Sequence, residues 1–423
     1  MPLSEKGAFV AEAIDRVRWL SEARFGLFVH WGMYALYARG EQVLFREHLT
    51  PSEYRRRAAD FNPRAYDAHQ WAELAREAGM RYAVLTAKHH DGYALFDSHV
   101  SDFTSARTRP GRDLVREYVE AFRAAGLRVG LYYSLADWQW PAYFRGPERD
   151  PQGFQRFIEY IHAQVRELCS SYGDLDVLWF DGAWPHSPEN WRAQELLDMI
   201  RALQPGILVN DRTGLPGDFG TPEQHILGGV QPRAWEACVT SVERHWGYHA
   251  GERQCKSSEQ IIHMLAQVAE GGGNLLLNVG PKADGSLPSP FVELLHEVGG
   301  WLRLNGEAIY GCAPGVCESI SIGRQTVRSG TVYLHVLYWP GETLRLAGLE
   351  NRVLSARYLA DGWPIRFQQE GDHLTLIGLP SLPPDPRNTV IALEVEGEPR
   401  ACAWAADRLW QGDAGRMADW AET

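Results

Sequence analysis

Short apolar runs alternate with amphipathic helical patterns over the first two-thirds of the chain. The runs FGLFVHW, YAVLTAK, VGLYYSL and DVLWFDG are each followed by a segment with apolar residues at helical spacing. Further strands are expected at GILVND, WEACVT and NLLLNVG, and an eighth around residues 309–311. Near-continuous apolar strands joined by helices are typical of a parallel sheet covered on both faces. About eight such units favour a closed (β/α)8-type barrel over an open sheet, giving an α/β fold class.

Beyond residue 311 the pattern changes to short segments of alternating polarity, separated by Gly and Pro. This alternation predicts a small antiparallel β-sandwich, with strands in the segments 331–338, 352–360, 372–379 and 389–397. We therefore expect three parts along the chain: a catalytic barrel over 1–311, a β-sandwich over 312–400 and a tail of uncertain structure over 401–423.

Composition narrows the class of partner. Among 423 residues, 42 Lys and Arg oppose 54 Asp and Glu, and the net charge of −12 argues against a nucleic-acid surface. No apolar window reaches the roughly 18 residues of a membrane span, and charges interrupt the N-terminus where a signal peptide is apolar. Six scattered cysteines without CxxC spacing predict reduced thiols. A cytoplasmic protein is expected, and a homo-oligomer stays open.

Polar and ionisable residues follow most of the expected strands. One such residue is usually a hydrogen-bonded structural group, but six sites together indicate a functional site, since burying ionisable groups costs free energy. In β/α barrels the chemistry collects at these strand ends. The residues are His30, Lys88, His89, His90, Asp91, Asp137, Asp181, Asp211 and Arg212, with Glu236 inside its own apolar run.

Asp181 has the most informative surroundings, because it stands at the tip of the apolar strand in DVLWFDGAW. A carboxylate in that place can act as a nucleophile. The alternative is an N-cap for the next helix, but Pro185 and Pro188 place that helix several residues later. The catalytic interpretation is therefore favoured.

A metal site is the chief alternative for the histidine-rich segment after the second strand, since imidazole and carboxylate bind zinc and iron. Neighbouring residues on a strand face opposite ways, so His89 and His90 share a metal only if the strand has already ended at Lys88. HExxH and CxxC are missing, and GGGN at 271–274 precedes its strand and lacks the Lys-Ser/Thr of a phosphate loop. No metal and no cofactor are expected.

Several segments together resemble the α-L-fucosidases of glycoside hydrolase family 29, in order across most of residues 20–310. They are RFGLFVHWGMYAL, YAVLTAKHHDGYALFDS, GLYYSLADW, DVLWFDGAW, VNDR and GGGNLLLNVGPKADGSLP. The resemblance implies hydrolysis of terminal α-L-fucosyl linkages with retention, through a covalent fucosyl-enzyme formed on Asp181. The partner it implies is a fucosylated oligosaccharide or glycoconjugate.

A retaining enzyme needs a second carboxyl that protonates the departing oxygen and later activates water. The family carries this residue on a variable loop after the VNDR segment, and Glu223 in TPE is the match chosen here. Glu236 is the second choice as acid/base. Its place inside a regular apolar run suits a fixed structural or substrate-positioning role better.

By the same resemblance, the fucose hydroxyls are expected to contact three histidines, with two aromatic residues and an arginine completing the pocket: His30, His89, His90, Tyr133, Trp179 and Arg212. Glu41 matches a polar position after the first strand, but Gln42 stands where the family usually has Trp. Two other classes stay open: a barrel that binds saccharide without cleaving it, and a metal-dependent hydrolase.

Overall fold

The computed structural model describes residues 16–317 and 321–402. The predicted tail therefore falls, from residue 403 on, outside the described residues. The chain divides into two compact units. The first comprises Met1–Ile226, Pro232–Ser257 and Asn274–Gly299, and the second comprises Leu227–Gln231, Ser258–Gly273 and Gly300–Thr423. The division into domains at residue 311 stays a prediction.

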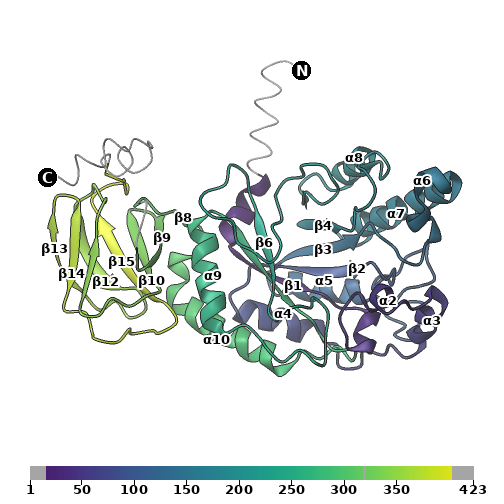
Figure 1. Cartoon of the computed structure of the whole chain (residues 1–423), viewed down its shortest axis with the longest axis horizontal. Helices are drawn as coiled ribbons and strands as arrows, with labels where there is room; N and C mark the ends of the chain where they lie inside the picture. The colour runs from purple at the N-terminus through teal and green to yellow at the C-terminus, as the bar shows by residue number, and fades with distance from the viewer. Residues whose placement is uncertain (1–15, 318–320, 403–423) are drawn as a thin grey trace, which may run out of the picture. The chain divides into compact units, whose positions relative to one another are not determined.

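A seven-stranded parallel sheet forms the centre of the first unit, and its strands fall within the seven predicted apolar runs or extend one by a single residue (Figure 1). The hydrogen-bonded order is β5-β4-β3-β2-β1-β7-β6. The strands are β1 (Phe25–Val29), β2 (Tyr82–Lys88), β3 (Arg128–Ser134), β4 (Val177–Asp181), β5 (Leu208–Val209), β6 (Glu236–Thr240) and β7 (Asn274–Val279). Nearly every strand residue is buried, as expected when helices cover the sheet.

Helices separate most of these strands in sequence and include the segments with predicted helical spacing. Their bounds are α2 (Val43–Arg46), α3 (Pro51–Arg56), α4 (Ala68–Glu77), α5 (Leu114–Ala124), α6 (Pro141–Arg149), α7 (Pro151–Ser171), α8 (Ala193–Leu203), α9 (Ser258–Glu270) and α10 (Ser289–Asn305). Short 3-10 turns are η1 (Met33–Tyr37), η2 (Arg57–Ala59) and η3 (Gly306–Ala308). Asp67 and Asp113 cap α4 and α5 by accepting backbone N–H bonds, which satisfies donors that a helix start leaves free.

The prediction of an eighth strand at residues 309–311 is wrong. The chain leaves α10 through η3 and then turns at Gly311, whose φ of 64° is a left-handed conformation unsuited to a strand. Instead, the extended segment 219–223 lies between β5 and β6. Three parallel bridges hold this segment in place. Phe219 pairs with Asn210 just after β5, Gly220 pairs with Trp235 just before β6, and Glu223 pairs with Cys238 in β6.

The interior of the parallel sheet holds one continuous hydrophobic cluster. It takes side chains from every strand and from the segment 219–223: Phe28, Tyr82, Val84, Tyr132, Val177, Trp179, Leu208, Phe219, Cys238 and Leu276. Tyr82 covers Gly26 so closely that a Cβ there would meet its ring at 2.4 Å. Glycine at position 26 therefore lets this large ring enter the interior.

The second unit contains two antiparallel sheets, of order β12-β15-β10-β9-β8 and β11-β14-β13. The strands are β8 (Ala313–Pro314), β9 (Gly323–Arg328), β10 (Thr331–Val336), β11 (Thr343–Leu346), β12 (Val353–Tyr358), β13 (Arg366–Glu370), β14 (His373–Ile377) and β15 (Thr389–Val395). Both sheets contribute to one buried cluster, which includes Leu334, Leu344, Leu376 and Ile391. This is the packing expected of the predicted β-sandwich. The four predicted segments contain β10, β12, β14 and β15.

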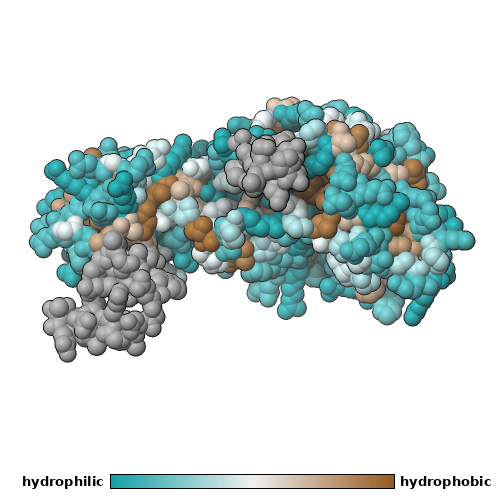
Figure 2. Space-filling view, turned by 90° about the horizontal axis from the view of Figure 1, so that it is seen from above, coloured by the Kyte–Doolittle hydropathy of each residue, from teal (hydrophilic) through white to brown (hydrophobic). Residues whose placement is uncertain are grey.

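Hydrophilic side chains cover most of the face shown in Figure 2, and hydrophobic ones form smaller groups between them. None of the described helices is long and apolar enough to cross a membrane.

Candidate active site

The strand ends of the parallel sheet surround a cavity of about 260 Å³. Because parallel strands all end at the same edge, residues far apart in the chain meet there. The cavity is lined by Phe28, His30, Glu41, Gln42, His89, His90, Tyr132, Trp179, Asp181, Trp184, Arg212, Glu223, Cys238 and Trp246. Eight of these positions were named from the sequence as site residues, so the structure brings most of the predicted set together.

Asp181 is the last residue of β4, and its carboxylate reaches the cavity. Tyr132 donates a hydrogen bond from its hydroxyl to Asp181 Oδ2 at 3.0 Å, and Arg212 Nη1 donates to Oδ1 at 3.3 Å. His90 Nε2 lies 3.8 Å from Oδ2. Burial raises the pKa of Tyr132 well above its usual value, so this hydroxyl stays a proton donor. The carboxylate is thus held by fixed donors.

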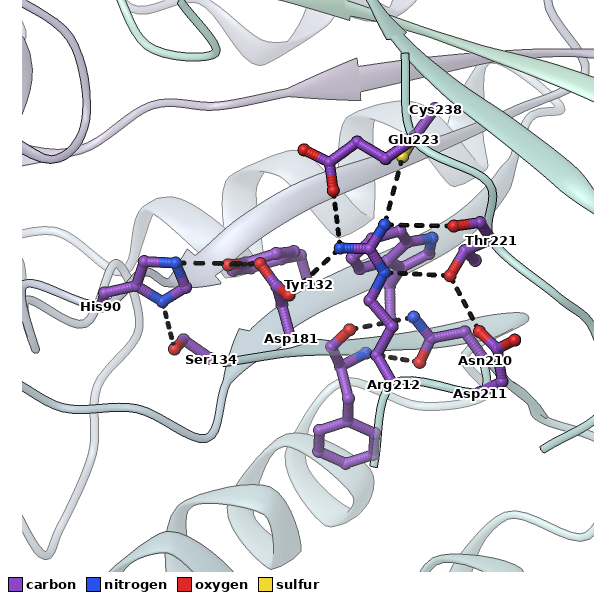
Figure 3. A network of polar contacts seen from close by, with 12 residues as sticks. His90, Tyr132, Ser134, Asp181, Asn210, Asp211, Arg212, Thr221, Glu223 and Cys238 are labelled. Atoms are coloured by element: carbon purple, nitrogen blue, oxygen red, sulfur yellow. Dashed lines mark hydrogen bonds and ion pairs between the residues drawn. The ribbon is translucent and has the colours of Figure 1, made fainter. Parts of the chain in front are cut away.

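Arg212 joins the two predicted catalytic carboxyls (Figure 3). Its Nη1 contacts Glu223 Oε2 at 2.9 Å as well as Asp181 Oδ1 at 3.3 Å. These two oxygens therefore lie no further apart than both distances together. One guanidinium nitrogen thus brings an oxygen of each carboxyl into the same small region of the cavity.

Thr221 holds the guanidinium in this position. Its hydroxyl accepts from Arg212 Nε at 3.0 Å and donates to Asp211 Oδ1 at 2.8 Å, while its carbonyl accepts from Arg212 Nη2 at 3.1 Å (Figure 3). A guanidinium with several fixed acceptors is oriented, not only attracted. The orientation of Arg212 in turn sets where both carboxyls point.

Glu223 stands on the paired segment 219–223 and not on a free loop. Next to it, Cys238 donates its backbone N–H to the Pro222 carbonyl at 3.1 Å, and Gln224 donates to the Cys238 carbonyl at 2.9 Å. The Glu223 side chain remains 43% exposed, so it faces the mouth of the cavity while its backbone is fixed to β6.

The three histidines all reach the cavity and are buried. Burial lowers the pKa of His30 to about 3 and that of His90 to about 4, so both imidazoles are neutral near pH 7. His30 Nδ1 lies 2.7 Å from Asn278 Oδ1, and His90 Nδ1 lies 2.6 Å from Ser134 Oγ. A neutral ring offers one donor and one acceptor, which suits a sugar hydroxyl.

His89 and His90 share the cavity although they are neighbours in sequence. The strand β2 ends at Lys88, and the two rings lie with their centroids 4.0 Å apart. His89 Nδ1 is buried and has no hydrogen-bond partner among the described residues. A buried polar atom without a partner is costly unless a ligand supplies one.

The expectation that Tyr133 lines the pocket is wrong, because this side chain points out of the sheet interior. Its hydroxyl donates to Gln164 Oε1 on α7 at 2.9 Å, and Tyr132 faces the cavity instead. The register pairs Tyr132 with Trp179 across β3 and β4, so these two rings share one face. Trp179 and Asp181 mark one face of β4 by strand alternation, but only the register with β3 assigns Tyr132 to the same face.

Glu236 lies behind the cavity wall and does not line it. It is 1% exposed, and its Oε1 accepts from Trp179 Nε1 at 3.0 Å while Tyr82 donates its hydroxyl to Oε2. Burial raises the pKa of Glu236 to about 7. These contacts fit a fixed structural role behind Trp179, and the expectation that Glu236 contacts the substrate is not met in the cavity wall. Glu223, and not Glu236, lines the cavity beside Asp181.

Glu41 does line the cavity, but its carboxylate also holds a loop. Its Oε2 accepts from the backbone N–H groups of Trp246 and Gly247 at 3.2 and 2.9 Å. Trp246 thereby enters the cavity wall next to His30, at a ring distance of 5.0 Å. Sequence reasoning missed Phe28, Trp184, Cys238 and Trp246, because the loops and faces that carry them have no distinctive pattern.

A family model described as Alpha-L-fucosidase matches residues 11–307. The chain belongs to the α-L-fucosidase family. It is similar to the tissue alpha-L-fucosidase of Rattus norvegicus, with 32% identity over 87% of this chain and 86% of the relative. It is also similar to that of Bos taurus, with 34% identity over 76% of this chain and 75% of the relative.

Solved α-L-fucosidase structures superpose on most of the chain. Isoenzyme 1 from Paenibacillus thiaminolyticus has a TM-score of 0.87 at 41% identity, covering 91% of this chain and all of that structure. A family 29 enzyme from Bacteroides thetaiotaomicron has a TM-score of 0.84 at 28% identity, covering 90% and 96%. That enzyme was trapped as a covalent intermediate with 2-fluoro-fucosyl fluoride, in a variant with Gln in place of a Glu.

Gln42 lines the cavity beside Glu41, so the polar residue found in place of the usual Trp does reach the pocket wall.

Within residues 16–317 and 321–402, no three His, Cys, Asp or Glu side chains are grouped to hold a metal ion, and the six cysteines are free thiols.

Proposed function

We propose that this α-L-fucosidase removes terminal α-L-fucose with retention, using Asp181 as nucleophile and Glu223 as acid/base. The observation that carries the proposal is the contact of both carboxylates with one nitrogen of Arg212. This contact brings two carboxyls within reach of one glycosidic bond, the arrangement on which double displacement depends.

In the first step, an Asp181 oxygen attacks the anomeric carbon while the bond from that carbon to the leaving oxygen breaks. Glu223 donates its proton to the leaving oxygen, and a covalent fucosyl ester forms on Asp181. In the second step, Glu223 takes a proton from water, the water oxygen attacks the anomeric carbon and the ester bond breaks. Two inversions at one carbon give net retention.

Glu223 has to exchange partners during this cycle. In the free protein it pairs with Arg212, whereas the first step needs a protonated Glu223 beside the leaving oxygen. Entry of the substrate displaces the guanidinium from Glu223, and Arg212 keeps its contact with Asp181. Arg212 thereby stays beside the nucleophile while the acid is freed.

The neutral histidines His30, His89 and His90 are proposed to bind the fucose hydroxyls, against an aromatic wall that includes Trp179. Such a site selects a sugar because a substrate lacking one hydroxyl leaves a buried polar group unpaired. The fucose methyl group then lies against apolar side chains such as Phe28 and Trp246, which line the same cavity.

We also propose that the parallel sheet is a closed (β/α)8-type barrel in which segment 219–223 takes the place between β5 and β6. Its bridges to both neighbours and the buried Phe219 support this closure. No helix separates β5 from this segment, so one β/α unit is abbreviated. The cytoplasmic location and the oligomeric state stay predictions.

Hydrolysis is favoured over a saccharide-binding barrel without activity, since the relatives are α-L-fucosidases and the carboxyl pair is present. The test is hydrolysis of an aryl α-L-fucoside, followed by NMR of the first sugar released. The proposal expects turnover with α-L-fucose as the initial product. An initial β-anomer would contradict retention, and full activity after addition of a strong chelator is expected.

A further inference from the structure

A second cavity, of about 500 Å³, lies outside the catalytic one and shares none of its lining residues. Its walls come from the segments that follow β2 and β3 and from the helices α3 and α7. The side chains used in the argument below are Arg55, Arg107, Asp137, Gln139, Trp140 and Tyr160. All lie in the first unit.

The charges around this cavity are balanced by neighbours. Arg55 pairs with Asp102 at 2.6 Å, and Arg107 pairs with Asp97 at 3.4 Å. Asp137, which is 1% exposed, pairs with the buried Lys88 at 3.3 Å. No unbalanced charge of either sign is left for an ionic ligand, so the wall suits a neutral molecule.

Aromatic rings and fixed polar groups occur together in the wall. The half-buried Trp140 packs against Tyr160, with ring centroids 5.0 Å apart, and the Arg55 guanidinium covers the Phe103 ring at 4.5 Å. The Gln139 side-chain oxygen Oε1 is buried without a hydrogen-bond partner among the described residues, whereas the two Asp137 oxygens are taken by Lys88 Nζ and the Gln139 backbone N–H. Rings bind the apolar face of a sugar, and polar side chains bind its hydroxyls.

The second cavity is connected to His90 of the catalytic cavity through the segment that follows β3. Trp138 donates its backbone N–H to the His90 carbonyl at 2.8 Å, and its ring packs 5.1 Å from that of His90. The next residue, Gln139, donates from Nε2 to the Asp91 carbonyl at 3.0 Å. One short segment therefore contacts His90 of the catalytic cavity and also lines the second cavity.

We propose that this cavity is a second binding site, for a neutral, unfucosylated saccharide unit of a glycan. The site goes beyond the fucose-cleaving centre and does not depend on it. It gives the enzyme affinity for the glycan that carries fucose, at a place separate from the bond that is cleaved.

The test is binding of N-acetyllactosamine, a neutral disaccharide without fucose, measured by saturation-transfer NMR and calorimetry at millimolar concentration. Four variants locate the binding: Trp140→Ala and Arg107→Ala in the second cavity, Trp184→Ala at the catalytic cavity and Arg109→Ala outside both. Trp184 is 54% exposed, so its loss is a matched aromatic control. Because the ligand has no fucosyl bond, the result is independent of the proposed hydrolysis.

We expect binding to weaken about tenfold in Trp140→Ala and several-fold in Arg107→Ala, and to be unchanged in the other two. Arg107 is half-exposed, so its variant still decides the question if Trp140→Ala does not fold. Loss of binding in Trp184→Ala with none in Arg107→Ala would overturn the proposal. So would absence of binding in the wild type, or binding of sialyllactose, which is anionic, in preference to the neutral disaccharide.

Discussion

Asp181 and Glu223 contact the same nitrogen atom of Arg212, at 3.3 and 2.9 Å. The two carboxyls come from different parts of the chain, one from the end of β4 and one from the segment paired with β6. A shared cation is what allows two acidic groups to sit close together in a partly buried site. The shared guanidinium therefore ties the positions of the two carboxyls together.

Glu223→Ala removes the proposed acid/base, and its effect should depend on the leaving group. A nitrophenyl fucoside needs little protonation of its leaving oxygen, whereas a natural glycoside needs much. We therefore expect a loss in kcat/KM of about 10²–10⁴-fold on fucosyl oligosaccharides and a far smaller loss in the first step on 2,4-dinitrophenyl fucoside. Glu243→Ala, an exposed carboxyl on the loop after β6, is the control. Equal losses on both substrates would reassign the acid.

Thr221→Val removes the hydroxyl that joins Arg212 to Asp211 while keeping the side-chain shape. With Arg212 less firmly oriented, kcat should fall about tenfold while KM changes little, because the two reacting carboxyls lose a fixed partner. Thr221→Ser keeps the hydroxyl and should restore kcat. An unchanged kcat in Thr221→Val would show that this hydroxyl does not position Arg212.

His89 has a buried Nδ1 without a partner, and we expect a fucose hydroxyl to supply one. His89→Ala should lower kcat/KM by about 10- to 100-fold on an aryl fucoside. The comparison uses the 2-, 3- and 4-deoxy aryl fucosides. On the analogue that lacks the hydroxyl bound by His89, the substitution should cause little further loss. Equal losses on all three analogues would contradict a direct contact.

Glu236 predicts a pH dependence of stability. Burial raises its pKa from 4.5 to about 7 in the folded protein, so the folded state holds a proton that the unfolded chain releases near 4.5. The free energy of unfolding that the protonated Glu236 side chain contributes is fully present below pH 4.5 and is lost as the pH rises towards 7. Relative to Glu236→Gln, the wild type should lose free energy of unfolding over this range, on the order of 3 kcal/mol. Urea unfolding at a series of pH values measures the difference, and a constant difference would refute it.

The central strands could be predicted from the sequence because a parallel sheet buried on both faces requires uninterrupted apolar runs. The runs at 82–88 and 176–182, for example, contain β2 and β4, and three ionisable residues at or just after the ends of these strands line the cavity: His89, His90 and Asp181. These site residues could be predicted from their place at strand ends, because the carboxyl ends of parallel strands meet at one edge of the sheet.

The hydrophobic pattern could not predict which way a strand side chain points, or which irregular segments pair with the sheet. Where both faces of a strand are apolar, adjacent tyrosines look alike, and only the pairing of Tyr132 with Trp179 shows which one points inwards. The segment 219–223 is short and contains Gly and Pro, so no apolar run marked it as part of the sheet. Trp246 enters the cavity through the contact of its loop with Glu41, which lies 205 residues earlier in the chain.

Covalent trapping of the nucleophile tests the central claim most directly. The protein, with Glu223→Gln to slow turnover, is incubated with 2-fluoro-fucosyl fluoride, digested and analysed by peptide mass spectrometry. Asp181 as nucleophile predicts one fluorofucosyl adduct, on the peptide containing residue 181 and lost in Asp181→Asn. An adduct on another carboxyl, or a labelled Asp181→Asn variant, would contradict the account.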